Sequence, residues 1–450
     1  MNHSSTIVAI ITPPGKGAVA GIRLSGKEAL SIANEVFSKN ILSPVSHKAL
    51  YGEFIGKTTR KVIDQVLLLP MRGPNSYTGE DIVEIFCHGS PVITKEIVHE
   101  LVECGATPAK GGEFTFRAFQ NGKIDLMQAE AVQSLISSEN VLAASCAKDH
   151  LEGALSKKIG SFQTALTDIG AVFAAAIDFP EEGLSFATSQ EIKDQIRNIL
   201  QEMQELLSSF QDGKKIREGA SFCLIGAPNA GKSSLLNTLL RKERAIVTSA
   251  PGTTRDFIEE KFVLGAHHFA LIDTAGIREG LCPIEKEGIR RSKEAAQKAD
   301  FHLLVIDGSS PKSDEVLSLL EQSSPEKTIL VWNKADLAKP SFDPRFPYQL
   351  YMSAKTGEGL ATLENLFKAI AWENPPESYP LIITEKRHQT CLQDAISCLE
   401  TVLAGLEGGM SFEFLGVDLQ DCLNALARLI GTNVTEDLLS SIFSQFCVGK

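Results

Sequence analysis

The chain has 450 residues, of which 43% are apolar and 22% charged, and its formal net charge is −12. This length is too great for one ordinary core and indicates about three domains, while the composition excludes a disordered chain. The acidic balance excludes a general binder of polyanions, so any contact with RNA must be local or shared with a partner.

The nine cysteines form no CxxC pair, and their odd number excludes complete pairing within the chain. Both features indicate a reducing compartment. The first apolar run, "TIVAII", is too short for a signal peptide and has no cationic leader, and no apolar run approaches the ~20 residues that span a bilayer. We therefore expect a cytoplasmic protein that does not enter a membrane.

Residues 1–123 predict a compact α+β domain. Short β-branched runs, "STIVAII", "VIDQVLLLP" and "DIVEIF", alternate with Gly/Pro turns and with two helical patterns, "KEALSIANEVF" and "ITKEIVHELVECG". Residues 124–215 change to apolar spacings of three and four, which are typical of one helix face. The first such face comprises Leu151, Leu155, Ile159, Phe162, Leu166, Ile169 and Phe173.

Between residues 216 and 375, five strand-like runs alternate with helical stretches: "SFCLIGAP", "HFALIDTAG", "FHLLVIDGS", "TILVWNKAD" and "YQLYMSAK". This alternation predicts a parallel sheet with crossover helices. Helical spacing returns over residues 376–450. We therefore expect a multidomain protein in which an α/β domain is inserted into a discontinuous all-α domain.

The segment "GAPNAGKSS" fits the phosphate-binding pattern GxxxxGK[ST], with Gly226, Gly231, Lys232 and Ser233 in register. It follows a predicted strand and precedes a predicted helix. Backbone N–H groups of such a loop hold the α- and β-phosphates, while Lys232 is expected to reach the β/γ oxygens and Ser233 to bind Mg²⁺. For this segment alone, a glycine turn that leads into a helix is the simpler alternative.

Four further motifs follow in chain order at strand ends or in loops: "PGTTRD", "DTAG", "NKAD" and "SAK". Open α/β sheets bind ligands at the carboxyl ends of their strands, so these loops are expected to converge on one nucleotide. Thr254 would meet Mg²⁺ and the γ-phosphate, Asp273 would hold a water of the metal, and the Gly276 N–H would sense the γ-phosphate. Asp336 selects guanine, because its carboxylate accepts two hydrogen bonds from N1–H and N2–H.

We therefore predict GTP as the nucleotide, and the blocks together resemble the translation-factor-related class of small GTPase domains. The predicted GTP-binding residues are Asn229, Ala230, Gly231, Lys232, Ser233, Ser234, Thr248, Ser249, Ala250, Pro251, Gly252, Thr253, Thr254, Asp273, Thr274, Ala275, Gly276, Asn333, Lys334, Ala335, Asp336, Ser353, Ala354 and Lys355.

Hydrolysis needs a group that orients water and a positive charge at the phosphates. The residue after the DTAG glycine is Ile277, which supplies neither. Asn229 is a candidate ligand for a monovalent cation that would supply the charge, or else it only caps the loop. Glu279, Glu285 and Glu287 are candidates to orient water, or else they are solvated surface carboxylates.

Several blocks together resemble the family of tRNA-modification GTPases known as MnmE or TrmE: "GPNSYTGEDIVEI", "GGEFTFRAFQNGKIDLMQAEA", "AAIDFPEE", "GAPNAGKSSLLN", "DTAGIRE" and the terminal "FCVGK". The resemblance extends over essentially the whole chain. It implies an N-terminal domain similar to tetrahydrofolate-binding domains, a split helical domain and an inserted G domain. It also implies potassium-dependent dimerisation of G domains, which activates hydrolysis.

The resemblance also assigns roles to individual residues. Glu285 matches the family's water-orienting glutamate, and Cys447 would lie near the one-carbon unit of the folate as a second catalytic residue. The positions that bind folate in the family are Arg23, Glu80, Lys123 and Lys450. The metal positions are Ser233 and Thr254 for Mg²⁺, and Asn229, Thr248, Ala250 and Thr253 for K⁺.

The implied activity is addition of an aminomethyl-type group, notably carboxymethylaminomethyl, to carbon 5 of the wobble uridine of certain tRNAs. The implied assembly is a homodimer that joins the flavoprotein MnmG (GidA) in a heterotetramer-type complex. A 5-formyl- or methylene-tetrahydrofolate would supply the one-carbon unit and the partner's FAD would handle the redox step. GTP turnover would drive conformational change.

Two other classes of function remain open at this stage. A ribosome-assembly GTPase of the Era or Der type needs an RNA-reading module, which is usually basic. From Pro376 onward the chain has four basic residues against ten acidic ones, which disfavours such a module. A folate-dependent enzyme that acts alone would need a redox carrier, and no flavin or nicotinamide fingerprint is present in the sequence.

Overall fold

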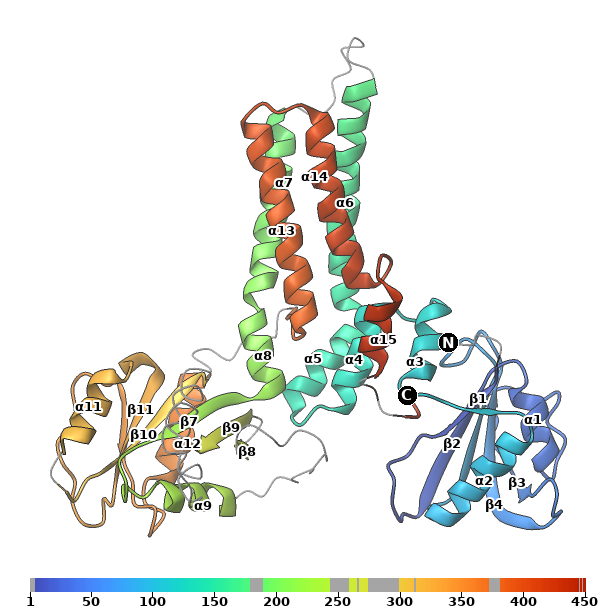
Figure 1. The fold of residues 1–450 in the computed structure, drawn as a ribbon, viewed down its shortest axis with the longest axis horizontal. Coiled ribbons are helices and arrows are strands. Elements are labelled where there is room, and N and C mark those ends of the chain that lie inside the picture. Colours follow the sequence, from blue (N-terminus) through green and yellow to red (C-terminus); the bar gives the residue numbers. More distant parts are fainter. Residues whose placement is uncertain are drawn as a thin grey trace, which may run out of the picture. The chain divides into compact units, whose positions relative to one another are not determined.

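The computed structural model describes residues 5–178, 189–242, 259–264, 267–273, 299–310, 313–371, 381–444, 446 and 448–450. The chain divides into two compact units (Figure 1). The first consists of residues 1–136, 147–200 and 391–450, and the second of residues 137–146 and 201–390.

The first unit contains a six-stranded sheet in the order β3-β4-β5-β2-β1-β6. Neighbouring strands are antiparallel except β1 and β6, which are parallel. The strands are β1 Ile7–Ile10, β2 Val19–Ser25, β3 Leu50–Ile55, β4 Val62–Met71, β5 Ile82–His88 and β6 Thr107–Pro108. The runs that predicted β1, β4 and β5 are confirmed, whereas β2, β3 and β6 were not predicted.

Two helices, α1 Ala29–Val36 and α2 Pro91–Glu103, form a hydrophobic core together with this sheet. Both helices confirm the helical patterns in the sequence. Their buried apolar side chains form one cluster with alternate residues of the strands. The cluster includes Leu30, Ile32 and Ala33 of α1, Ile97 and Leu101 of α2, and Val8, Ile22, Leu24 and Ile85 of the sheet.

The remaining helices of the N-terminal half and of the C-terminal segment are mostly long. They are α3 Glu113–Gln120, α4 Leu126–Ile136, α5 Val141–Leu151, α6 Ala154–Asp178, α7 Ser189–Ser208, α13 Lys386–Glu407, α14 Phe412–Ile430 and α15 Glu436–Ser444. In Figure 1, α14 runs beside α6, although the two are far apart in sequence. Phe173 of α6 stacks on Phe412 of α14, with ring centroids 5.0 Å apart. The helical domain is therefore discontinuous, as predicted.

Helix α6 confirms the predicted apolar face from Leu155 to Phe173. The prediction was wrong at Leu151, which ends α5, because the intervening Gly153 has a left-handed φ of 82° and interrupts the helix. By length and composition α6 could also cross a membrane, since an 18-residue window has a mean hydropathy of 1.2. The core helix of a helical bundle can meet the same criteria of length and composition. The buried residues of α6 recur at helical spacing along one stripe, as they do in such a bundle helix.

The second unit contains a six-stranded sheet in the order β12-β11-β10-β7-β9-β8. The strands are β7 Ala220–Ile225, β8 Glu259–Leu264, β9 His267–Asp273, β10 Phe301–Asp307, β11 Thr328–Asn333 and β12 Tyr348–Tyr351. The five predicted strands are parallel to one another. Strand β8 was not predicted and pairs antiparallel at one edge.

Helices pack against both faces of this sheet. Helices α9 Lys232–Lys242 and α12 Leu360–Ala371 share a core with Phe222, Leu303 and Val305. Helix α11 Asp314–Gln322 packs against Leu304 and Ile306, which alternate with them along β10. The described part of this unit also contains α8 Phe210–Glu218 and the short 3₁₀ helix η1 Pro325–Lys327. Because all five parallel strands end at one edge, their following loops are neighbours.

Candidate functional site

The loop between β7 and α9 has the geometry of a phosphate-binding loop. Gly226 and Gly231 have left-handed φ values of 157° and 95°. A Cβ on Gly226 would collide with the Val305 carbonyl, and one on Gly231 with the Asn333 amide, so both positions require glycine. Asn229 also has a positive φ, of 61°, which asparagine tolerates better than most residues.

Lys232 begins α9, and its Nζ donates hydrogen bonds to the carbonyls of Gly226 and Ala227 at 2.8 and 2.9 Å. The ammonium group therefore lies over the loop that is expected to hold phosphates. Ser233 and Ser234 follow in the first turn of the same helix. A hydroxyl at the start of a helix that follows such a loop is the usual position of a Mg²⁺ ligand, so Ser233 fits that role.

Asn333 joins three of the predicted loops. Its side chain is buried, its Nδ2 donates to the Ala230 carbonyl at 2.8 Å, and its Oδ1 accepts from the Ala354 N–H at 3.0 Å. The Ala335 N–H donates to the Met352 carbonyl at 3.0 Å. Hydrogen bonds thus join the phosphate loop, the "NKAD" segment and the "SAK" turn to one another.

Asp336 belongs to the "NKAD" segment and is exposed. Within the described part of the chain its carboxylate makes no hydrogen bond or ion pair, and both oxygens are open to N–H donors of a base. The neighbouring Lys334 forms an ion pair with Asp307 at 2.5 Å. Burial raises the pKa of Asp307, but hydrogen bonds from Lys334 and Ser309 outweigh it and lower that pKa to about 2.

The sequence did not single out Asp307 as a site residue. It is the last residue of β10 and lies opposite Asn333 in the register with β11. Its position at the carboxyl end of a parallel strand was the available signal. Asp307 holds Lys334 beside the predicted base pocket.

Asp273 ends β9 next to the phosphate loop, since it pairs with Leu224 of β7. The remaining predicted residues of this site lie outside the described residues. They are Thr248, Ser249, Ala250, Pro251, Gly252, Thr253, Thr254, Thr274, Ala275, Gly276 and the three candidates Glu279, Glu285 and Glu287. Their roles stay predictions. Among the described residues no group of three His, Cys, Asp or Glu side chains is arranged to hold a metal ion.

The four predicted folate residues lie around α3 and the 73–81 loop of the first unit. The Arg23 guanidinium forms an ion pair with Glu84 at 2.7 Å and lies over the rings of Tyr77 and Phe114, at 5.2 and 5.6 Å from their centroids. Burial raises the pKa of Tyr77. The Arg23 guanidinium therefore lies on the sheet beside one carboxylate and two aromatic rings.

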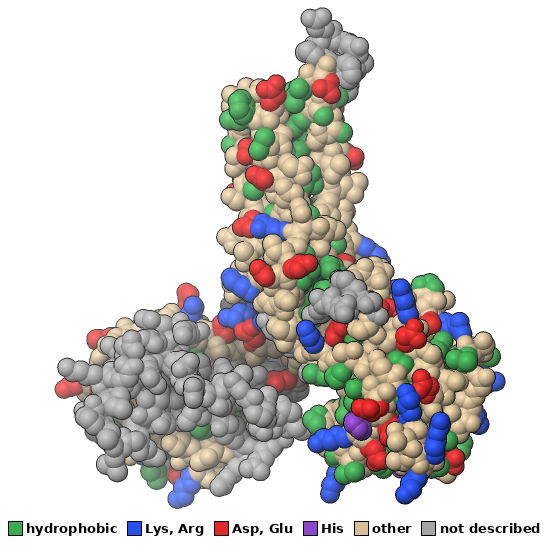
Figure 2. Space-filling model, turned by 45° about the vertical axis from the view of Figure 1, so that its right-hand side comes forward, with side chains coloured by type: hydrophobic (Ala, Val, Ile, Leu, Met, Phe, Trp, Pro, Cys, Tyr) green, Lys and Arg blue, Asp and Glu red, His purple; other side chains and the backbone are tan. Residues whose placement is uncertain are grey.

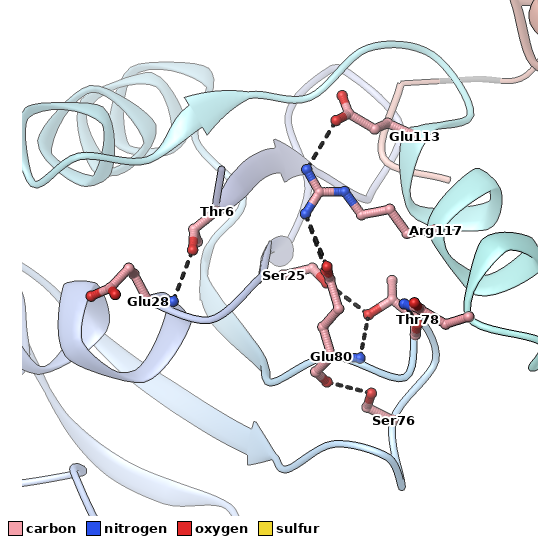
Figure 3. Close-up of polar contacts among 9 residues, drawn as sticks. Thr6, Ser25, Glu28, Ser76, Thr78, Glu80, Glu113 and Arg117 are labelled. Atoms are coloured by element: carbon pink, nitrogen blue, oxygen red, sulfur yellow. Dashed lines mark hydrogen bonds and ion pairs between the residues drawn. The ribbon is translucent and has the colours of Figure 1, made fainter. Parts of the chain in front are cut away.

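Glu80 is held by Arg117 and Ser25, as Figure 3 shows. Lys123 lies along the same loop, where its Nζ donates to the Pro74 carbonyl at 2.9 Å. The Lys450 carbonyl accepts from the Phe114 N–H at 3.2 Å. Arg23 and Lys450 therefore both contact Phe114 of α3, and Glu80 contacts Arg117, which lies one turn later on the same helix.

The C-terminal segment does not continue the last helix. Helix α15 ends at Ser444, Val448 forms a β-bridge with Gly111, and Gly449 packs so closely on the Ile10 carbonyl that no side chain would fit. Phe443 packs edge-on against Phe116, with centroids 5.2 Å apart. Cys447 itself lies outside the described residues, and its catalytic role stays a prediction.

A parallel sheet with helices on both faces, a phosphate-binding loop and a guanine-type "NKAD" motif that Asn333 links to this loop define a P-loop GTPase. Two family models match the chain: "GTP-binding protein TrmE N-terminus" over residues 6–123 and "MnmE helical domain" over residues 126–447. The chain belongs to the MnmE family of tRNA modification GTPases.

Curated relatives agree with this assignment over their full length. The tRNA modification GTPase MnmE of Protochlamydia amoebophila is 47% identical and is aligned over 99% of this chain and 97% of its own. That of Chlamydia trachomatis serovar L2 is 42% identical over 100% of both chains. Among solved structures, the G domain of the T. maritima FeoB iron transporter is 29% identical over 34% of this chain and 98% of its own, with a TM-score of 0.26.

The predicted multidomain architecture is thereby confirmed: a TrmE-type N-terminal domain, a discontinuous helical domain and an inserted P-loop GTPase domain. The chain is a GTP hydrolase that acts in tRNA modification.

Proposed function

We propose that this chain is a potassium-activated GTPase that works with the flavoprotein MnmG (GidA) in the cytoplasm. Together they would add a carboxymethylaminomethyl-type group to carbon 5 of the wobble uridine of certain tRNAs. A tetrahydrofolate derivative would supply the one-carbon unit, and the partner's FAD would serve the redox step. The working assembly would contain a homodimer of this chain.

The observation that carries this proposal is the position of the C-terminal tail on the N-terminal domain. Lys450 and Arg23 both contact Phe114, and Glu80 is tied to the same helix through Arg117. The tail end and Arg23 contact α3 at Phe114, and Glu80 contacts it at Arg117; this arrangement would suit a ligand with both a ring and charged groups. The tail residue Cys447 follows Phe446, which is buried beside α3.

The charge distribution supports a shared rather than an independent tRNA site. On the face drawn in Figure 2, Lys and Arg side chains over the N-terminal domain are interspersed with Asp and Glu. A general RNA binder concentrates cations on one surface. The tRNA contact is therefore expected to be completed by the partner.

Mg²⁺ would be held by Ser233 and Thr254, and K⁺ by Asn229 and the loop of Thr248, Ala250 and Thr253. Of these six residues the structure describes Ser233 and Asn229. The bound cations would supply positive charge at the phosphates, where Ile277 offers none. Asn229 fits this role because its αL backbone belongs to the phosphate loop and its amide oxygen is a suitable cation ligand.

GTP turnover is expected to be about 10-fold faster or more in KCl than in NaCl at equal ionic strength, since a fitted cation replaces an arginine finger. A steady-state assay of phosphate release in the two salts measures this ratio. Asn229→Gly keeps the positive φ without strain and removes only the amide, so the ratio should fall toward one. Equal rates of the wild-type protein in both salts would contradict potassium activation.

Nucleoside analysis of tRNA from a strain without this gene tests the whole proposal. We expect the C5-modified wobble uridines to disappear and to return with a plasmid copy. Normal wobble uridines together with a ribosome-assembly defect would favour the Era or Der type of switch instead.

A further inference from the structure

Arg117 of α3 is a buried cation between two carboxylates, and none of the roles above uses it directly. Its side chain is 5% exposed. Its Nη1 donates to both oxygens of Glu80, at 3.1 Å to Oε2 and 3.3 Å to Oε1, and its Nη2 donates to Glu113 Oε1 at 3.1 Å. Because a guanidinium keeps its proton in proteins, Arg117 is a permanent charge at this point.

The contacts of Glu80 are unequal at its two oxygens, as Figure 3 shows. Oε2 accepts from Ser25 Oγ at 2.7 Å as well as from Arg117, and Ser25 is in turn bonded to Thr78 at 2.7 Å. Within the described residues, Oε1 has only the longer bond from Arg117. Glu80 is therefore anchored through Oε2, while Oε1 keeps capacity to accept from a ligand.

The backbone at Glu80 is fixed by the same loop. Its N–H donates to Thr78 Oγ1 at 3.2 Å and its carbonyl accepts from Ser76 Oγ at 2.5 Å. The Glu80 side chain is 21% exposed, so part of it reaches solvent. The loop and Arg117 together leave Glu80 little rotational freedom.

We propose that Arg117 is a positioning residue for the folate pocket: it holds Glu80 by Oε2 and orients Oε1 toward N–H donors of the folate ring. This inference rests on the proposed folate function. Helix α3 then contributes two contacts to the pocket, because its Phe114 N–H also donates to the Lys450 carbonyl. Preorganised acceptors bind better than free ones, because less rotamer entropy is lost on binding.

A purely structural role is the alternative, since Arg117 also bonds Glu113 on its own helix at the i,i+4 spacing. Buried ion pairs add little net stability, but loss of one partner leaves an unpaired buried charge. The structural role predicts that Arg117 and Glu80 affect folate binding independently. The positioning role predicts that they act as one unit, which a double-mutant cycle measures.

The experiment uses the full chain with Arg117→Met, Glu80→Gln, the double variant and, as matched control, Glu113→Gln. Calorimetry with 5-formyl-tetrahydrofolate measures affinity, and circular dichroism and thermal unfolding check each fold. We expect Arg117→Met and Glu80→Gln each to weaken binding about 10- to 100-fold, as is typical for a lost hydrogen bond to a charged group. The double variant should bind no more weakly than Glu80→Gln, and Glu113→Gln should bind within about twofold of the wild type.

Additive losses in the double variant, or wild-type affinity of Arg117→Met, would overturn the positioning role while leaving the folate function intact. If Arg117→Met fails to fold, Arg117→Lys keeps the charge but not the forked contact, and the same cycle with Glu80→Gln decides. A wild-type protein that binds no folate would overturn the proposed folate function itself, and this inference with it.

Discussion

Asp336→Asn should weaken GTP binding about 100- to 10,000-fold and make xanthine nucleotides the preferred ligands. The carboxylate accepts both N1–H and N2–H of guanine, and each hydrogen bond to a charged group contributes about 1.5–3 kcal/mol. An amide offers one acceptor and one donor group, which match the N1–H and the C2 carbonyl of xanthine. The exposed Asp336 carries no internal partner in the described structure, so the change should not disturb the fold.

Competition between GTP and XTP for a fluorescent guanine nucleotide measures this change of preference. Asp314→Asn is the matched control, because Asp314 is likewise an exposed carboxylate but belongs to the first turn of α11 and not to the "NKAD" segment. It should bind GTP like the wild type. Retained GTP preference in Asp336→Asn would mean that the base pocket is misassigned.

Cys447→Ser should abolish wobble-uridine modification while GTP hydrolysis continues. The expected loss is large because a serine hydroxyl is a far weaker nucleophile than a thiolate near neutral pH. The flanking residues Phe446, Val448 and Gly449 are held against the N-terminal domain, so a near-isosteric change should leave the tail in place. The GTPase loops belong to the other compact unit.

Complementation of a deletion strain followed by nucleoside mass spectrometry measures the loss, and phosphate release from the purified variant measures hydrolysis. Cys398→Ser is a control, since this partly exposed thiol of α13 has its pKa raised by burial and by nearby carboxylates. Wild-type modification by Cys447→Ser would make Cys447 a packing residue. Collapse of hydrolysis as well would indicate a structural role.

Local sequence patterns predicted the strands that consist mostly of apolar residues. Strands β7, β10 and β11 of the second sheet are mostly apolar and buried, as expected for parallel strands with helices on both faces. Strands β2 and β3 were missed, and each contains a glycine. A Cβ on Gly21 would press on Ile11, and one on Gly52 on Phe37, so these glycines serve packing between distant segments. A local pattern does not contain that information.

The residues of the candidate sites also divide into those that local patterns predicted and those that they missed. The order of the motifs predicted that the described nucleotide residues would converge, and Asn333 does connect the phosphate loop to the "SAK" turn. Arg117 and Asp307 were missed because their importance lies in ion pairs with Glu80 and Lys334, which are distant in the sequence. An arginine four residues after a glutamate in an otherwise aromatic helix, "EFTFRAF", was a usable signal for a buried ion pair.

Transfer of an isotopically labelled folate carbon to the wobble uridine tests most directly whether a folate supplies the one-carbon unit in the proposed reaction. The purified chain, its flavoprotein partner with FAD and a reductant, glycine, GTP, Mg²⁺, KCl and unmodified tRNA would be incubated with methylene-tetrahydrofolate labelled in the one-carbon unit. The folate would supply the methylene carbon at C5, and glycine the carboxymethylamino part. We expect label in the C5 substituent of the wobble uridine, and none when GTP is left out. Modified nucleoside without label would contradict the folate role, and no modification by the complete mixture would contradict the proposed reaction.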